Sequence, residues 1–202
     1  FLAKTGLPDK PMIALLAGSR NGEISSMMPT FMAFADKLHA IPEYSEYRFV
    51  VAAAPARSEA DYTKYIGGRE HVSVVFGQSY AVMRHAKAAV VNSGTASLEC
   101  ALIGTPQVVA YKGAEINFLI AKMIIKIQYI SLGNLILDRI CFRELLQYYF
   151  TPDNVLNEVR RMIEDEEYRS AMLSGYQEIR DALGGEGASA AVARAMIGEL
   201  RK

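Results

Sequence analysis

The chain has 202 residues, of which 51% are hydrophobic, and its 22 basic and 22 acidic side chains leave no net charge. A chain of this length and composition can bury a substantial core, so we expect a soluble globular protein of one domain, or at most one and a half. The balanced charge and the lack of a basic patch interleaved with aromatic residues argue against nucleic-acid binding. The given sequence shows no signal-peptide pattern, and because its first residue is Phe1 rather than methionine we expect a piece of a longer protein.

The cysteines and histidines show no pattern that is typical of a metal site or a catalytic relay. Cys100 and Cys141 lie far apart, and neither belongs to a CxxC or Cys/His spacing. We therefore expect two reduced thiols in a cytosolic protein, without a bound metal or a disulfide. His39, His71 and His85 are scattered in the same way, which is typical of surface or core histidines.

Short apolar runs alternate with helical patterns along most of the chain. Residues 12–17 (MIALLA) are continuously apolar and stop at Gly18, and apolar residues at helical spacing follow through 28–38. The same order recurs, with further strands expected at 49–53, 72–76, 88–91 and 107–111, helices near 60–66, 80–85 and 96–103, and another helix after 107–111. Five such steps predict an α/β fold with a parallel, doubly wound sheet. Because the strands are apolar throughout, we expect helices on both faces of this Rossmann-like sheet.

The character of the sequence changes near residue 150. From Pro152 onward, amphipathic helical patterns rich in Glu and Arg are interrupted at 184–185 and resume at 188–200. We therefore expect residues 1–150 to form the Rossmann-like domain. Residues 151–202 would form C-terminal helices that pack on the sheet or on a missing partner.

The stretch 118–130 (FLIAKMIIKIQYI) is the most apolar in the chain. It is too short to span a bilayer, and it contains Lys122 and Lys126, which share one face of a helix. One interpretation is a core helix whose two lysines extend to solvent. The alternative is an interfacial helix that contacts membrane lipid.

Three loops follow expected strands at the edge of the sheet where open α/β proteins bind ligands. They are Gly18-Ser19-Arg20, Gly77-Gln78-Ser79 and Asn92-Ser93-Gly94-Thr95. The first offers close backbone approach and a guanidinium suited to phosphate, the second can present backbone groups to a base edge, and the third opens a helix whose free N–H groups suit an anion. Any one of them is also typical of an ordinary βα turn. Together they predict a nucleotide diphosphate, and the absence of GxGxxG and GxxxxGK[ST] argues against a dinucleotide cofactor or a P-loop NTPase.

Glu99 lies four residues after Thr95 and therefore on the same helix face, about 5.4 Å further along. A ribose attached to a phosphate at the helix start would reach about that far. A carboxylate can accept hydrogen bonds from two adjacent hydroxyls, which a phosphate-binding loop cannot do. The alternative is that Glu99 is a solvated helix residue.

Several runs in the same order and spacing resemble a known family across almost the whole chain. The runs are LLAGSRNGEI (15–24), NSGTASLECALIGTPQVVAYK (92–112), YISLGNLILDR (129–139) and RELLQ (143–147). Their combination resembles the C-terminal half of the bacterial lipid-A-disaccharide synthase family. The SGT…E element by itself is also similar to that of other glycosyltransferases and of nucleotide-sugar epimerases.

The resemblance implies the donor-binding half of a GT-B glycosyltransferase with a helical C-terminal tail. Such enzymes bind UDP-2,3-diacylglucosamine and transfer its sugar, with inversion, to 2,3-diacylglucosamine 1-phosphate. The acceptor and a catalytic carboxylate would belong to an N-terminal half that this chain lacks. We therefore expect a UDP-sugar as ligand, no cofactor and no catalytic residue in this chain. A cytoplasmic location is expected, with a peripheral inner-membrane contact and a homodimer as open alternatives.

The resemblance also assigns roles to individual residues. Ser19 and Arg20 would contact the diphosphate, and Glu99 would hold the ribose. The other residues implied at the sugar-donor site are Ser93, Gly94 and Thr95 around the diphosphate, and Asn134 and Arg139 along the pocket.

Two positions depart from the family pattern. Ala17 stands where a proline is usual before GSR, and Gly133 stands where a proline is usual before the asparagine. Both lie beside implied binding residues, so the conformation of these loops stays open. The other hypotheses are the corresponding half of a UDP-N-acetylglucosamine epimerase or a peptidoglycan glycosyltransferase, and a free-standing nucleotide-binding module without chemistry. Residues 131–139 (SLGNLILDR) favour the lipid-A-disaccharide synthase family over the first of these.

Overall fold

The computed structural model describes residues 1–113 and 128–184. The expectations for Lys122, Lys126 and the rest of 118–127, and for the helical pattern at 188–200, lie outside these described residues. Within the two described ranges, no helix combines the length and the apolar character needed to cross a bilayer.

The sheet is parallel throughout and has six strands in the order β3-β2-β1-β4-β5-β6. The strands are β1 (Met12–Leu16), β2 (Arg48–Ala53), β3 (Val72–Phe76), β4 (Ala88–Asn92), β5 (Gln107–Tyr111) and β6 (Glu144–Leu146). The parallel sheet and five of its strands agree with the sequence-based prediction to within a residue at each end. The sixth strand, with only three residues, was not predicted.

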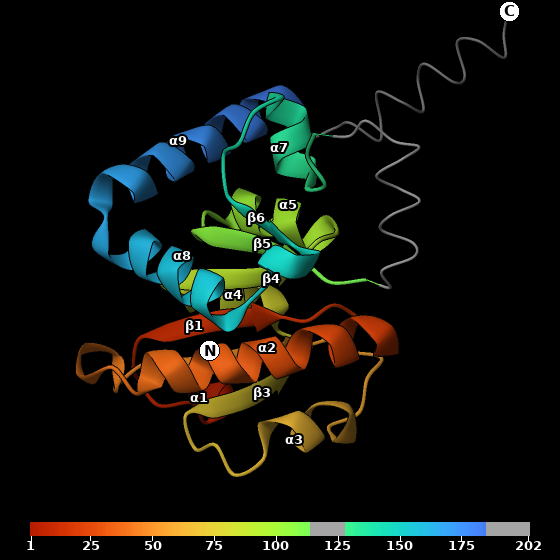
Figure 1. The fold of residues 1–202 in the computed structure, drawn as a ribbon, viewed down its shortest axis with the longest axis vertical. Coiled ribbons are helices and arrows are strands. Elements are labelled where there is room, and N and C mark those ends of the chain that lie inside the picture. Colours follow the sequence, from red (N-terminus) through yellow and green to blue (C-terminus); the bar gives the residue numbers. More distant parts are fainter. Residues whose placement is uncertain (114–127, 185–202) are drawn as a thin grey trace, which may run out of the picture.

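The described helices lie on both faces of the sheet, as the apolar strands predict (Figure 1). The helices are α1 (Leu2–Thr5), α2 (Asn21–His39), α3 (Ala60–Ile66), α4 (Ser79–His85), α5 (Thr95–Ile103), α7 (Leu132–Leu137), α8 (Pro152–Glu164) and α9 (Glu166–Leu183), with short 3-10 turns η1 (Pro42–Tyr44) and η2 (Gln147–Tyr149). Figure 1 shows α2 and α8 crossing the near side of the sheet.

Alternate strand residues point to opposite sides, and each side is covered. Ile13 and Leu15 belong to a core cluster with α2, α3, α8 and α9, whereas Ala14 and Leu16 belong to a second cluster with α4 and α5. All four are buried, so β1 needs apolar side chains at every position. The C-terminal helices α8 and α9 thus share one core with the sheet.

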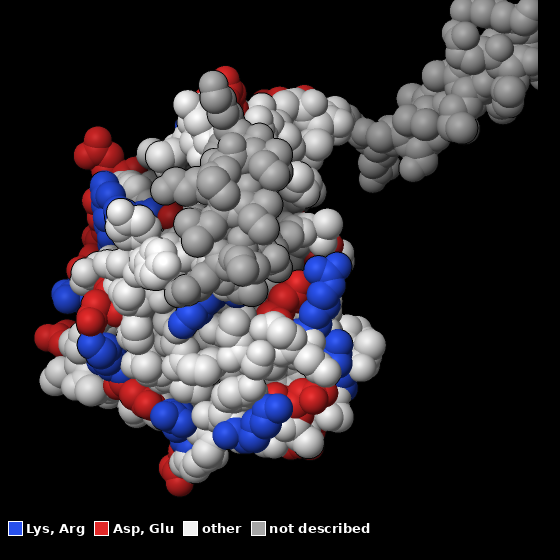
Figure 2. All heavy atoms as spheres, turned by 45° about the vertical axis from the view of Figure 1, so that its right-hand side comes forward, with Lys and Arg blue, Asp and Glu red and all other residues white. Residues whose placement is uncertain are grey.

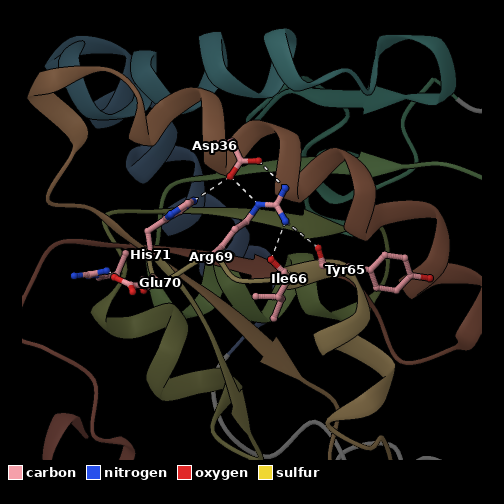
Figure 3. A network of polar contacts seen from close by, with 7 residues as sticks. Asp36, Tyr65, Ile66, Arg69, Glu70 and His71 are labelled. Atoms are coloured by element: carbon pink, nitrogen blue, oxygen red, sulfur yellow. Dashed lines mark hydrogen bonds and ion pairs between the residues drawn. The ribbon is translucent and has the colours of Figure 1, made fainter.

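A charged cluster fixes the last turn of α2 (Figure 3). Arg69 Nε and Nη2 each donate to one carboxylate oxygen of Asp36 at 2.7 Å, and Nη1 donates to the carbonyl of Ile66 at 2.7 Å. His71 Nε2 lies 3.2 Å from the same carboxylate. The hydrogen bonds from Arg69 hold the pKa of Asp36 below its ordinary value of 3.8. The far end of α2 is therefore tied to the segment that precedes β3.

The strand order places a crevice between β1 and β4. From β1 the chain moves outward to β2 and β3, and from β4 it moves in the opposite direction to β5 and β6 (Figure 1). Connections that leave two neighbouring strands in opposite directions open a space at their carboxyl ends. The loops that follow β1 and β4 meet there, and α2 and α5 both begin there.

Candidate nucleotide-binding cleft

A cleft of about 480 Å³ lies at the carboxyl ends of β1, β2 and β4. It is lined by the loop after β1, the loop after β2 and the start of α5. The lining residues are Leu16, Gly18, Ser19, Arg20, Glu23, Ala52, Ala53, Ala54, Pro55, Ser79, Asn92, Ser93, Gly94, Thr95, Ala96 and Glu99.

The cleft brings together seven of the eleven residues that the sequence assigns to ligand binding. They are Gly18, Ser19, Arg20, Ser93, Gly94, Thr95 and Glu99. Four others do not line it, namely Gly77, Gln78, Asn134 and Arg139. The two loops that meet at the crevice were therefore the most informative part of the sequence.

Gly18 is required by the close approach of two neighbouring side chains. Its φ is +93°, in the region that favours glycine. A Cβ built there would lie 2.4 Å from Glu23 Oε2 and 2.7 Å from Asn92 Nδ2. A side chain at this position would push both groups away, so the first loop can adopt this path only with glycine.

Glu23 caps the start of α2 and was not singled out by the sequence. Its Oε2 accepts hydrogen bonds from the backbone N–H groups of Ser19 at 2.8 Å and of Arg20 at 3.0 Å. Its Oε1 lies 3.2 Å from Arg20 Nη1. A capping box normally starts with Ser or Thr, whereas here the N-cap is Arg20, so the sequence does not carry the usual signature of this cap.

Arg57 holds the same loop from outside the cleft. It lies between β2 and α3, and its Nε donates to the carbonyl oxygen of Ser19 at 2.5 Å. Its Nη1 donates to Asn21 Oδ1 at 2.6 Å. Nothing in the local sequence indicates this role, because the contact joins segments more than thirty residues apart.

The starts of α2 and α5 differ in whether their backbone N–H groups are paired. We call the start of α2 filled, because Glu23 accepts from N–H groups there, and that of α5 open, because its first N–H groups have no acceptor among the described residues. The first turn of α5 contains no acidic residue, and no side chain in the part of the chain that the structure describes caps it. Within the described chain, the backbone N–H groups of Gly94, Thr95 and Ala96 have no hydrogen-bond acceptor. Helix N-termini with free N–H groups attract anions through these donors and the helix dipole.

Glu99 follows one turn after Thr95 on the cleft side of α5. It lines the cleft and is half-buried. The helix starts at Thr95, within a residue of the start that the sequence predicts. Glu99 therefore lies about one helical turn, or roughly 5.4 Å along the helix axis, beyond Thr95.

The loop after β3 lies beside the cleft rather than in it. Gly77 makes the turn with a φ of +66°, and Gln78 is the N-cap of α4. The next residue, Ser79, lines the cleft. Gly77 and Gln78 are thus adjacent to the cleft wall.

Asn134 is fully buried and its side chain is engaged within the protein. Nδ2 donates to the carbonyl of Phe142 and to Glu144 Oε1, each at 2.9 Å. Oδ1 accepts from the backbone N–H of Cys141 at 2.8 Å. In this structure the residue joins α7 to the segment before β6.

Arg139 and Gly133 also make contacts away from the cleft. Arg139 Nη2 donates to Glu178 Oε1 on α9 at 2.6 Å. A Cβ at Gly133 would lie 2.8 Å from the ring of Phe142. The packing against Phe142 therefore leaves no room for a side chain at Gly133.

The overall charge contributes little to the cleft. On the face shown in Figure 2, basic and acidic side chains alternate without an extended area of one sign. Attraction for an anion must therefore come from local groups, chiefly the start of α5 and Arg20.

Comparison with known proteins identifies relatives over the whole chain. A family model described as lipid-A-disaccharide synthetase matches residues 2–195. The lipid-A-disaccharide synthase of Anaeromyxobacter dehalogenans is 33% identical over 204 aligned residues, which cover 100% of this chain and 53% of that protein. The synthase of Myxococcus xanthus is 36% identical over 199 residues, covering 98% and 51%. The chain thus spans about half the length of the curated relatives it matches.

Solved structures show the same fold at low sequence identity. The calicheamicin glycosyltransferase CalG4 has a TM-score of 0.59 at 20% identity, covering 95% of this chain and 43% of that one. The E. coli ADP-heptose lps heptosyltransferase II has a TM-score of 0.59 at 16% identity, covering 82% and 50%. A UDP co-structure of S. aureus MnaA has a TM-score of 0.61 at 14% identity, covering 99% and 48%. The described fold is therefore that of one half of a GT-B glycosyltransferase.

Proposed function

The chain belongs to the lipid-A-disaccharide synthase family, and on that premise we propose that it is the part of such an enzyme that binds the nucleotide of the sugar donor. The donor would be UDP-2,3-diacylglucosamine. The reaction would be transfer of its sugar to an acylated glucosamine phosphate, with the acceptor and the catalytic carboxylate supplied by residues outside this chain. No cofactor is needed in this scheme.

The observation that carries the proposal is the pairing of an open helix start with a carboxylate one turn away in the same cleft. The N–H groups of Gly94, Thr95 and Ala96, which have no acceptor among the described residues, suit a diphosphate. Glu99 suits two neighbouring ribose hydroxyls. The small side chain of Ser93 and the lack of one at Gly94 let an anion approach the backbone closely.

The assignments of Arg20, Gly77 and Gln78 follow from their places around the cleft. Arg20 would contact the outer phosphate, since it lines the cleft close to the start of α5. Gly77 and Gln78 would contact the base, because their turn leads directly into Ser79 on the cleft wall. The assignment of Asn134 and Arg139 rests on the resemblance alone.

All residues of the cleft fall within 1–150, so we assign nucleotide binding to that range. Residues 151–184 support it, because α8 and α9 complete the core under the sheet. A peripheral contact with the inner membrane is also proposed, on the apolar sequence 118–130 with Lys122 and Lys126. It is tested by replacing both lysines with glutamate in the complete enzyme and measuring binding to anionic vesicles.

The experiment that tests the proposed function is calorimetric titration of the 202-residue chain with UDP, UMP, uridine and ADP. We expect UDP to bind most tightly and the chain alone to transfer no sugar. Failure of UDP to bind at millimolar concentration would remove the proposal. Turnover of a diacylglucosamine sugar donor and acceptor by this chain alone would show that the catalytic groups lie within it.

A further inference from the structure

The cleft contains a local imbalance of charge. Among the described residues that line it, Arg20 is the one basic side chain, whereas Glu23 and Glu99 are both acidic. A cleft lined in this way should repel a diphosphate unless one carboxylate is neutralised or moves. The proposed ligand therefore raises the question of what happens to Glu23.

The two oxygens of Glu23 have different partners. Oε2 is fixed, because it accepts hydrogen bonds from the backbone N–H groups of Ser19 and Arg20. It also packs so closely against Gly18 that a Cβ there would lie 2.4 Å away. Oε1 has one described partner, the guanidinium of Arg20 at 3.2 Å. The first oxygen thus shapes the loop, and the second is available for exchange.

The ion pair between these residues can open at small cost. The side chain of Arg20 is 84% exposed and that of Glu23 is 26% exposed. Ion pairs of this kind contribute little free energy in water, since solvent competes for both partners. A diphosphate carries more charge than one carboxylate and would attract the guanidinium more strongly.

We propose that Glu23 is an internal substitute for the ligand's phosphate, which holds Arg20 in the empty cleft and yields it to the diphosphate when the sugar donor binds. This inference rests on the proposed nucleotide-binding function. Oε2 keeps its two backbone N–H groups throughout, so the loop retains its shape while the guanidinium changes partner. Glu23 is thereby a positioning residue that lowers the affinity of the cleft for anions.

The variant Glu23→Gln separates the two roles of the carboxylate. The amide oxygen can accept from the Ser19 and Arg20 N–H groups as Oε2 does, which preserves the loop. The amide nitrogen cannot pair with a guanidinium, so Arg20 is free before the ligand arrives. We expect UDP to bind about two- to fivefold more tightly, UMP to gain less and uridine to change less than about twofold.

Two further variants sharpen the measurement. Glu59→Gln removes an equally negative, exposed carboxylate outside the cleft, and we expect no change in UDP affinity. In an Arg20→Ala background the gain from Glu23→Gln should fall below about twofold, because the two residues act through one ion pair. Should Glu23→Gln fold poorly, the Nε–H resonance of Arg20 in the unaltered chain gives an independent readout. It should shift with UDP and stay in place with uridine.

The outcomes distinguish this inference from the proposed function. Absence of UDP binding to the unaltered chain would overturn both. If UDP binds but Glu23→Gln brings no gain, or weakens UDP and uridine equally, Glu23 is only a helix cap and the inference is wrong. A full gain that persists in the Arg20→Ala background would equally overturn the exchange of partners.

Discussion

Two helices begin at the same cleft, and both carry a glutamate five positions after a glycine. In α2 the pair is Gly18 and Glu23, and in α5 it is Gly94 and Glu99. The carboxylate of Glu23 turns back onto the start of its own helix, whereas Glu99 stays on the cleft wall one turn further along. The same spacing therefore gives one filled and one open helix start.

The difference arises from where each helix begins. Because α2 begins at Asn21, Glu23 is its third residue, and a side chain there can reach the N-cap N–H. Because α5 begins at Thr95, Glu99 is its fifth residue and lies too far along to cap. A shift of two residues in the helix start thus decides whether a glutamate satisfies the backbone or stays available to a ligand.

The largest expected contrast is between the two glycines. Gly18→Ala should lower the free energy of unfolding by about 2–3 kcal/mol, because alanine is strained at this φ and its Cβ would displace Glu23 and Asn92. Gly94→Ala should cost less than about 0.5 kcal/mol, since its backbone is extended and nothing lies within 4 Å of a Cβ there. Urea denaturation of both variants checks this, and equal losses would contradict the difference between the two starts.

The next largest effect should come from Glu99. Glu99→Ala should weaken UDP binding by about 1.5–3 kcal/mol, the usual range for hydrogen bonds to a charged group. Binding of 2′,3′-dideoxy-UDP, which lacks both hydroxyls, should hardly change. Calorimetry with both ligands makes the measurement. If Glu99→Ala weakens the binding of both ligands equally, or changes the binding of neither, Glu99 does not bind the ribose. The proposed difference between the glutamates of α2 and α5 would then be wrong.

A smaller effect is expected for Arg20. Its side chain is 84% exposed, so solvent screens the pairing with a phosphate, and Arg20→Ala should weaken UDP binding by about 1 kcal/mol. Uridine binding should be unchanged. Arg160→Ala is the matched control, because that arginine is also surface-exposed and pairs with Glu164 away from the cleft. Equal losses for uridine and UDP would mean that Arg20 shapes the α2 loop instead.

The smallest expected effect is a loss of stability at low pH, caused by His71 at the far end of α2. The variants at the two helix starts should therefore be compared at a pH above the range in which His71 takes up a proton. Burial, and then the nearby charge of His39, lower the pKa of His71 below its ordinary value of 6.5. Asp36 and Arg69 face the same ring, and His39 stacks on it with centroids 4.2 Å apart. The unfolded chain therefore binds a proton at His71 more readily than the folded chain does. The contribution of neutral His71 to stability is complete above pH 6.5 and is lost as the pH falls through the lowered pKa.

We expect the free energy of unfolding to decrease between pH 7 and pH 5, because the unfolded chain binds this proton more readily than the folded chain in that range. The pairing of Asp36 with Arg69 does not contribute in this range, since the pKa of Asp36 is held below 3.8. Urea denaturation as a function of pH measures the effect. An unchanged slope in His71→Gln would show that another group is responsible.

The sequence alone was informative wherever the cause of structure is local. Continuous apolar runs such as 12–17 and 88–91 predicted strands that are buried on both faces, and the structure places them side by side at the centre of the sheet. The start of α5 at Thr95 follows from the change of pattern after β4. Seven cleft residues could be identified because strand ends in a parallel sheet share one edge.

Contacts between distant segments were decided only by the tertiary structure. Strand β6 has three residues, too few to show a periodic pattern, and it forms only because it pairs with β5. The side-chain amide of Asn134 donates hydrogen bonds to the carbonyl of Phe142 and to Glu144 Oε1. No spacing in the sequence indicates these contacts.

The cleft itself shows the same division. Its residue types could be read from two short loops, because small residues and glycine after a strand have local causes. Arg57 reaches Ser19 from another loop, and Glu23 turns inward only because Gly18 leaves room for its carboxylate. Which side chains were already engaged, and which were left for a ligand, depended on distances between segments that only the packed chain sets.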